Sequence, residues 1–155
     1  AQMERAAQRG LPVIVHNRDA IQDVLSMLRD WQSDWRKNYP DLSKHAGVLH
    51  SFSGTIEEAE QAVDMGFLIG ITGPVTYKKA FRLQHLVTVL PLECLLVETD
   101  APFMTPLPFR GKRNEPSYVR FTASKIAEVR GIDFEQVAEV TTANARRLFF
   151  RRESF

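Results

Sequence analysis

The sequence predicts an α/β fold in which parallel strands alternate with helices. Four short apolar runs start about 20–35 residues apart, and amphipathic segments separate them. Strands at this spacing are joined by helical crossovers and therefore lie parallel. The chain has 155 residues, of which 44% are hydrophobic and 25% charged, a composition typical of an ordinary globular domain. We therefore expect one α/β unit over residues 1–155.

The amino-terminal part predicts a helix, a strand and a second helix. Residues 1–10 have helical character, with Gly10 as a left-handed carboxyl-terminal cap and no residue that could cap the start. The chain is thus expected to begin inside a helix, as a piece of a longer protein would. Residues 11–16 are an apolar run typical of a strand buried on both faces. A helix over 19–35 follows, and then a polar connection over 37–44.

The middle of the chain predicts further strands, each followed by a helix or a loop. After a strand over 46–52, Thr55 and Glu58 have the spacing of a capping box, which starts a helix that ends at Gly66. The next elements that we expect are a strand over 67–72, a helix over 78–90, a strand over 95–99 and a proline-rich loop after Pro102.

Two helices are expected at the carboxyl-terminal end. They cover residues 117–130 and 134–149, with Gly131 between them. Asp133 is the expected amino-terminal cap of the second helix. The order of elements is therefore a helix, four strand–helix units and one more helix, in a single compact unit.

Charge and composition exclude several classes of protein. Lys and Arg number 20 and Asp and Glu 19, so a net charge of +1 gives no overall field that would recruit nucleic acid or an anionic membrane. The apolar runs are too short to span a membrane, and no signal peptide is visible. Cys94 lies in an apolar run and is expected to be a buried, inert thiol. These observations favour a cytoplasmic protein without a membrane partner.

Three residues with metal-binding side chains stand at the ends of predicted strands. They are His16, His50 and Asp100. The carboxyl ends of parallel strands meet at one rim, which is where α/β enzymes hold their working residues. Two imidazoles and a carboxylate suit Zn or Mn, and carboxylates with water suit Mg. Each residue also has a plainer interpretation: a histidine satisfied at a strand end, or an aspartate in a turn.

Other polar residues near this rim are open to two interpretations. Glu98 either orients a ligand or packs as a strand residue. Lys112 and Arg113 either clamp a phosphate or are solvated loop charges. The remaining candidates are expected to be ordinary surface or helix residues; they are His45, His85, Lys78, Lys79 and Arg82.

Six segments give the chain a resemblance to a known family. They are VIVHNRDA, GVLHSFSG, FLIGITGPVTYKKA, LLVETDAPFMTP, FRGKRNEP and VAEVTTANARRLF. In order and spacing they resemble the carboxyl-terminal half of bacterial TatD-type deoxyribonucleases, over residues 10–149. The ETDAP and RNEP segments are the most specific.

The resemblance implies a TIM-barrel fold of the metal-dependent hydrolase superfamily. It implies that His16, His50 and Asp100 are metal ligands for one or two divalent ions, Mg, Mn or Zn, and that Asp100 is also catalytic. Arg113 and Asn114 would lie near substrate phosphates. The implied activity is cleavage of DNA phosphodiesters, often as a 3′ exonuclease. The family's early His-x-His pair and central Glu have no counterpart in this sequence.

Length sets the main alternatives. A complete (β/α)₈ barrel needs roughly 250 residues and eight strands, whereas 155 residues supply four predicted strands. The strands at either end of the sheet would then be open edges. We expect the chain to be the carboxyl-terminal half of a barrel that the missing amino-terminal half, or a second copy, completes. The alternatives are a catalytically inactive half-barrel that acts only through association, and a hydrolase of another ester or amide.

Overall fold

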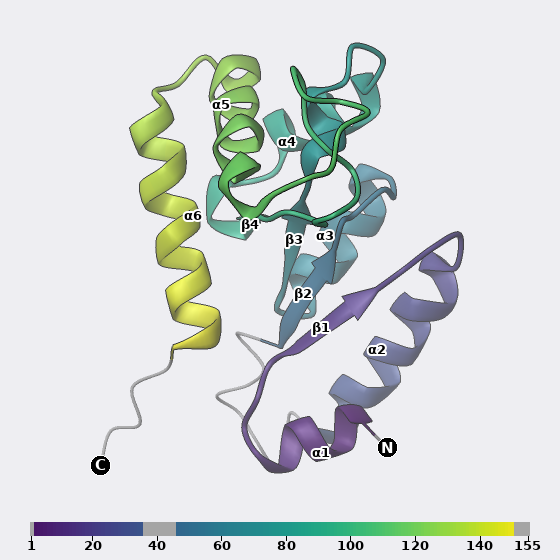
Figure 1. Cartoon of the computed structure of the whole chain (residues 1–155). Helices are drawn as coiled ribbons and strands as arrows, with labels where there is room; N and C mark the ends of the chain where they lie inside the picture. Colours follow the sequence, from purple (N-terminus) through teal and green to yellow (C-terminus); the bar gives the residue numbers. More distant parts are fainter. Residues whose placement is uncertain (1, 36–45, 151–155) are drawn as a thin grey trace.

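A four-stranded parallel sheet forms the centre of the protein. In the computed structural model, which describes residues 2–35 and 46–150, the strands follow the order β1-β2-β3-β4 (Figure 1). Their bounds are Val13–His16, Gly47–His50, Phe67–Ile71 and Leu95–Val97. All three strand pairs are parallel, as the spacing of the apolar runs predicts. The fold is α/β with four parallel strands.

Six α-helices accompany the sheet in the part of the chain that the structure describes. They are α1 (Gln2–Gln8), α2 (Ile21–Trp35), α3 (Ile56–Asp64), α4 (Phe81–Val89), α5 (Val119–Arg130) and α6 (Phe134–Phe149). Short 3₁₀ helices cover Gly73–Thr76 (η2), Leu92–Cys94 (η3) and Pro116–Tyr118 (η4). No described helix is long and apolar enough to cross a membrane.

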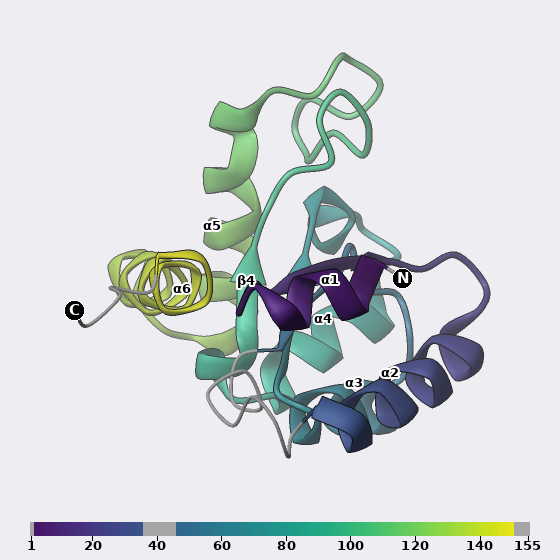
Figure 2. The same ribbon diagram turned by 90° about the horizontal axis from the view of Figure 1, so that it is seen from below.

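The two faces of the sheet are covered differently. Figures 1 and 2 show α2, α3 and α4 on one side, which we call the outer face. Alternate strand residues point to this face and join the main hydrophobic core; they include Val15, Leu49, Ile69 and Leu95. The largest core side chains, such as Phe67, are fully buried. Apolar burial on the outer face therefore holds the sheet.

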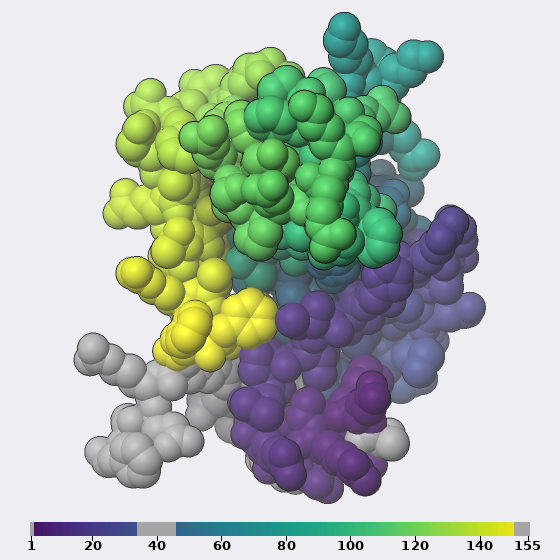
Figure 3. Space-filling model, viewed as in Figure 1, coloured from purple at the N-terminus to yellow at the C-terminus, as the bar shows by residue number. Residues whose placement is uncertain are grey.

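The opposite, inner face has a much smaller apolar cluster. Val48 and Leu96 are buried there under Leu148 of α6, with Leu68 and Ala145 packed beside them. Figure 3, which looks onto this face, shows α6 at the left, β1 at the right and the loop after β4 above. α6 thus covers the part of the inner face formed by Val48, Leu68 and Leu96.

The prediction that the first strand is buried on both faces is wrong. Burial alternates along β1, and Ile14 is 64% exposed while its register partner Val48 is 1% exposed. β1 is an edge strand, and α6 covers the inner face at Val48, Leu68 and Leu96 rather than at Ile14. The apolar sequence of the strand cannot report this difference, because it depends on which distant segment packs against each face.

Helix boundaries follow the capping signals in part. Thr55 and Glu58 form both hydrogen bonds of the expected capping box at α3. Gly10 and Gly131 have left-handed φ values of 64° and 66°, as helix-terminating glycines do. Asp133 stands at the cap of α6, but its side chain makes no capping hydrogen bond.

Three helices start later than the sequence predicts, and the first of them, α2, begins at Ile21 rather than at residue 19. α4 begins at Phe81 rather than at residue 78, because η2 and a turn intervene and the Gln84 side chain donates to the Val75 and Tyr77 carbonyls. α5 begins at Val119, after η4. The predicted connection over 37–44 and His45 lie outside the described residues.

A buried amide fixes α6 against the start of β4. Asn144 is 1% exposed and donates to the carbonyls of Leu92 and Leu95 at 3.0 and 2.8 Å. Its own carbonyl accepts from Arg147. Because all these polar atoms are satisfied, the strand that leads to Asp100 begins from a defined position.

Candidate metal-binding and catalytic site

Three predicted site residues meet at the carboxyl rim of the sheet. His16 ends β1 and His50 ends β2, and the two are register partners whose ring centroids are 6.0 Å apart. Asp100 follows β4, and its Oδ1 lies 3.2 Å from His50 Nε2. His50 is therefore the central member, with a histidine on one side and a carboxylate on the other.

A second carboxylate holds the other nitrogen of His50. His50 Nδ1 lies 2.8 Å from Glu98 Oε1, and the same oxygen accepts a hydrogen bond of 2.7 Å from the Ser51 backbone N–H. Of the two interpretations that the sequence leaves open for Glu98, the structure shows the contact with His50. This contact fixes the ring orientation and directs Nε2 toward Asp100.

The two carboxylates change the titration of the ring. Burial alone would lower the pKa of His50, but the hydrogen bond and charge of Glu98, followed by those of Asp100, outweigh it and raise the pKa above 6.5. The imidazolium is thus favoured while the two oxygens face it. A divalent ion would replace this proton, because a histidine must be neutral to bind a metal.

A glycine makes room for Glu98 on the inner face. A Cβ added to Gly70 of β3 would collide with Glu98 Oε1 and lie 3.0 Å from the Leu49 carbonyl oxygen. Gly70 is not among the site residues predicted from the sequence, although a glycine inside an apolar strand is a known sign of a close approach. Any larger residue at this position would displace the carboxylate that holds His50.

The residue after His50 has an unusual backbone. Ser51 has a φ of 49°, in the left-handed region that favours glycine. Its N–H reaches Glu98, and its hydroxyl lies 2.8 Å from Thr72 Oγ1. The turn therefore joins the ends of β2, β3 and β4 next to His50.

The donor set fits a divalent ion in its chemistry. His50 offers Nε2 beside a carboxylate oxygen while Nδ1 is bonded to Glu98, the arrangement in which metal-binding histidines are held. His16 stands alongside. Within residues 2–35 and 46–150, however, no group of three or more His, Cys, Asp or Glu side chains is spaced to hold one ion. The structure brings together a pair of donors, His50 and Asp100, with His16 as a neighbour.

The predicted phosphate-binding residues on the loop after β4 differ in exposure. Lys112 and Arg113 are exposed on it. Asn114 is 3% exposed, donates to the Phe103 carbonyl at 2.6 Å and accepts from the Glu115 N–H. Asn114 thus shapes the loop from inside. Contact of Arg113 or Asn114 with a substrate stays a prediction.

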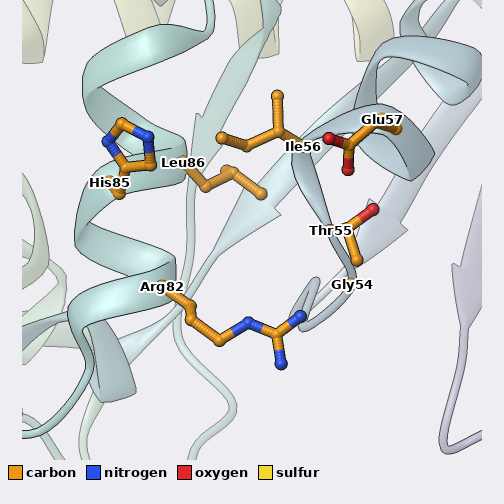
Figure 4. A pocket seen from close by; sticks show the side chains of 7 residues that line it. All are labelled: Gly54, Thr55, Ile56, Glu57, Arg82, His85 and Leu86. Atoms are coloured by element: carbon orange, nitrogen blue, oxygen red, sulfur yellow. The ribbon is translucent and has the colours of Figure 1, made fainter.

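Arg82 and His85, both expected to be ordinary surface or helix residues, lie on α4. Figure 4 shows Arg82 and His85 of α4 lining a cavity of about 230 Å³ together with Gly54–Glu57 at the start of α3. Cys94, expected to be buried, is half-buried in η3. Its partial burial first, then the charge of Glu93, raises the pKa of its thiol. A raised pKa agrees with an unreactive thiol.

Comparison with known proteins identifies the family of the chain. The model of the family described as TatD related DNase matches residues 1–150. The metal-dependent hydrolase YabD of Bacillus subtilis is 43% identical over 148 residues, which cover 96% of this chain and 54% of the relative. A protein of Citrobacter rodentium named 3′-5′ ssDNA/RNA exonuclease TatD is 39% identical over 96% of this chain and 55% of its own length.

A solved structure shows the same fold. The crystal structure of YJJV, a TatD homologue from Escherichia coli K12, aligns with a TM-score of 0.84 at 31% identity, over 97% of this chain and 54% of that one. The chain therefore spans about half the length of the relatives that it matches. Its four parallel strands correspond to part of a TIM-barrel hydrolase. The chain belongs to the TatD related DNase family.

Proposed function

We propose that this chain carries part of the active site of a divalent-metal-dependent phosphodiesterase that acts on DNA, as a 3′ exonuclease. The observation that supports the proposal is the position of His50, held by Glu98 and facing Asp100 at the carboxyl rim of a parallel sheet. The name of the Citrobacter rodentium relative, which specifies single-stranded DNA and RNA, supports a nucleic-acid substrate.

The proposed mechanism gives each of these residues a separate role. His16, His50 and Asp100 would hold the ion, and Glu98 keeps His50 oriented. When bound, a divalent ion lowers the pKa of a water molecule and neutralises charge on the phosphoryl oxygens. Asp100 lies at the rim and accepts the proton of the attacking water. In this proposal Arg113, which is exposed on the loop after β4, contacts a substrate phosphate.

A partner half completes the site in this proposal. The two edge strands of the described sheet are β1 and β4, and the inner face leaves Ile14 exposed. The missing amino-terminal half of a barrel, or a second copy of this chain, would pair with these edges and supply further ligands. The same observations favour a second candidate function: a catalytically inactive half-barrel that acts only by associating with a partner chain.

The test compares hydrolysis with and without the complementary half. We expect the purified chain alone to degrade 3′-labelled single-stranded DNA weakly or not at all with Mg or Mn. Mixed with the amino-terminal half of a relative such as the Bacillus subtilis protein, it should gain activity, and Asp100→Asn should remove most of that gain. Asp133→Asn is the matched control, because Asp133 is exposed and makes no capping hydrogen bond.

Each function has a distinct result. An association-only half-barrel would bind the complementary half and leave DNA intact in every mixture. Full activity of the chain alone would contradict the need for a partner. An unchanged rate in Asp100→Asn would remove Asp100 from the site.

A further inference from the structure

A basic pocket lies on the same rim as the candidate site, and no role is yet assigned to it. Its volume is about 510 Å³. Residues that follow β3 form one wall, among them Tyr77, Lys78 and Lys79, and Leu107 and Arg110 of the loop after β4 form the other. Three of the lining side chains are cationic and none is acidic. The lining surface is mostly apolar, and the charges on it are all positive, so the charged groups of the pocket favour an anion although the net charge of the whole chain is only +1.

The side chains of the pocket are held in place by contacts between the two loops. The Arg110 guanidinium carbon lies 4.4 Å from the centre of the Tyr77 ring. The Tyr77 hydroxyl donates to the Thr105 carbonyl at 3.0 Å, and the Leu107 N–H donates to Thr76 Oγ1 at 2.8 Å. Stacking fixes the plane of the guanidinium and leaves its N–H groups for an anion.

The cations of the pocket are not neutralised by neighbouring acids. Among the ion pairs of the described residues, none includes Lys78, Lys79 or Arg110. Among the described residues, no carboxylate thus pairs with the guanidinium or the two ammonium groups, and an anionic ligand would not have to displace one. A group with several anionic oxygens, such as a phosphodiester, would satisfy it.

One short stretch of chain connects the pocket with the candidate site. The loop runs from Asp100, which faces His50, to Thr105, which accepts from Tyr77 in the pocket wall. Between them, Met104 Sδ lies 3.4 Å from the hydroxyl of Ser51, the residue after His50. A strand of nucleic acid that follows this stretch would contact both places.

The same stretch presents an aromatic ring to solvent. Phe103 is 68% exposed, although its backbone N–H is bonded to the Asp100 carbonyl at 2.6 Å. An exposed phenyl ring beside a catalytic carboxylate gains nothing from the core. The ring offers a face on which an unpaired base can stack. A base inside a duplex is already stacked between its neighbours and cannot do so.

We propose that this pocket binds a backbone phosphate of a single-stranded nucleic acid, one or more nucleotides away from the phosphodiester at His50 and Asp100. Arg110, Lys78 and Lys79 contact the phosphate, and Phe103 stacks on a base of the intervening stretch. The inference rests on the proposed function and adds the part of the substrate that determines strand binding.

The experiment measures binding without hydrolysis. Fluorescein-labelled dT₁₂ is titrated with the 155-residue chain in EDTA, and anisotropy gives Kd over a series of salt concentrations. Arg110→Ala should weaken binding roughly five- to tenfold at low salt and lower the salt slope by about one. Arg110→Lys should recover part of the loss, because it keeps the charge. Phe103→Ala should weaken binding by about fivefold or more.

The matched control is Arg120→Ala. Arg120 also stacks on an aromatic ring, with its guanidinium carbon 4.7 Å from the centre of Phe121, but it lies on α5 outside the pocket. This variant should leave Kd within about twofold of the parent value. Circular dichroism of each variant excludes loss of fold as the cause.

Three results would overturn the inference. They are equal losses in Arg110→Ala and Arg120→Ala, equal affinity for dT₁₂ and for a duplex of the same length, and displacement of dT₁₂ by inorganic phosphate at equal concentration. The last result would mean that the pocket binds free phosphate rather than a strand. Because no hydrolysis occurs in EDTA, these outcomes are independent of the Asp100→Asn test, which concerns the proposed function alone.

Discussion

The outer and inner faces of the sheet differ in how many apolar and how many charged side chains they carry. On the outer face, helices cover every strand and the buried core is continuous from Leu25 and Leu28 of α2 to Ile126 of α5. On the inner face, three buried residues form a separate small cluster, and the polar side chains of His50, Glu98 and Asp100 lie above it. The outer face therefore contributes most of the packing that stabilises the sheet. The inner face carries the charged side chains, whose relative positions depend on the register of the strands.

The largest difference between the faces should appear in stability. Ile69 on the outer face is 0% exposed and Ile14 on the inner face 64%. Ile69→Ala removes buried methyl groups and should lower the free energy of unfolding by about 2–5 kcal/mol. Ile14→Ala, the same chemical change, should cost less than about 0.5 kcal/mol. Urea denaturation of both variants measures the difference, and equal costs would show that the inner face is packed in solution.

A smaller effect is expected where the inner face is crowded by Glu98. Gly70→Ala places a methyl group against the carboxylate, so Glu98 must leave His50. Affinity for Mn²⁺, measured by calorimetry, should fall roughly 10- to 100-fold, as for other changes to residues that hold a metal-binding histidine. Gly10→Ala is the control for a general loss of stability, since its left-handed φ of 64° strains the alanine while the added Cβ meets no other atom. Unaltered affinity in Gly70→Ala would separate Glu98 from the function of His50.

The smallest effect is a pH dependence of the metal-free chain. The folded-state pKa of His50 is raised above 6.5 by its two carboxylate neighbours, against the opposing effect of burial. Its contribution to stability is therefore complete below pH 6.5 and is lost as the pH rises through the folded-state value. Thermal melts in EDTA should show this decline in the parent chain and not in His50→Gln. The same decline in both would assign it to another group.

Much of the fold could be predicted because its signals are local. Apolar runs such as the one that becomes β3, and the capping box of Thr55 and Glu58, depend only on neighbouring residues. The exposure of Ile14 could not be predicted, because it depends on where α6 packs, more than 100 residues away. The sequence also places α4 too early, since the side chain of Gln84 holds the preceding turn in another conformation.

The candidate site shows the same division between local and distant signals. The rule that strand ends share a rim predicted that His16, His50 and Asp100 would gather, and the structure places them there, while their roles stay a proposal. Glu98 and His50 are 48 positions apart in the sequence, and they are in contact in the structure. The sequence alone could not decide whether Glu98 orients a ligand or packs as a strand residue. The pocket of Arg110 and Tyr77 was missed, because it exists only where two loops meet.

The two histidines of the rim are anchored unequally. His50 is on β2, an interior strand with neighbours on both sides, whereas His16 ends β1 and hydrogen-bonds to the sheet along one side alone. An ion shared by the two rings would cross-link the edge strand to the interior of the sheet. Part of the free energy of ion binding would then be spent on fixing β1. A loosely paired edge strand would therefore lower the affinity for the ion. In return, a bound ion would protect the edge strand from local unfolding.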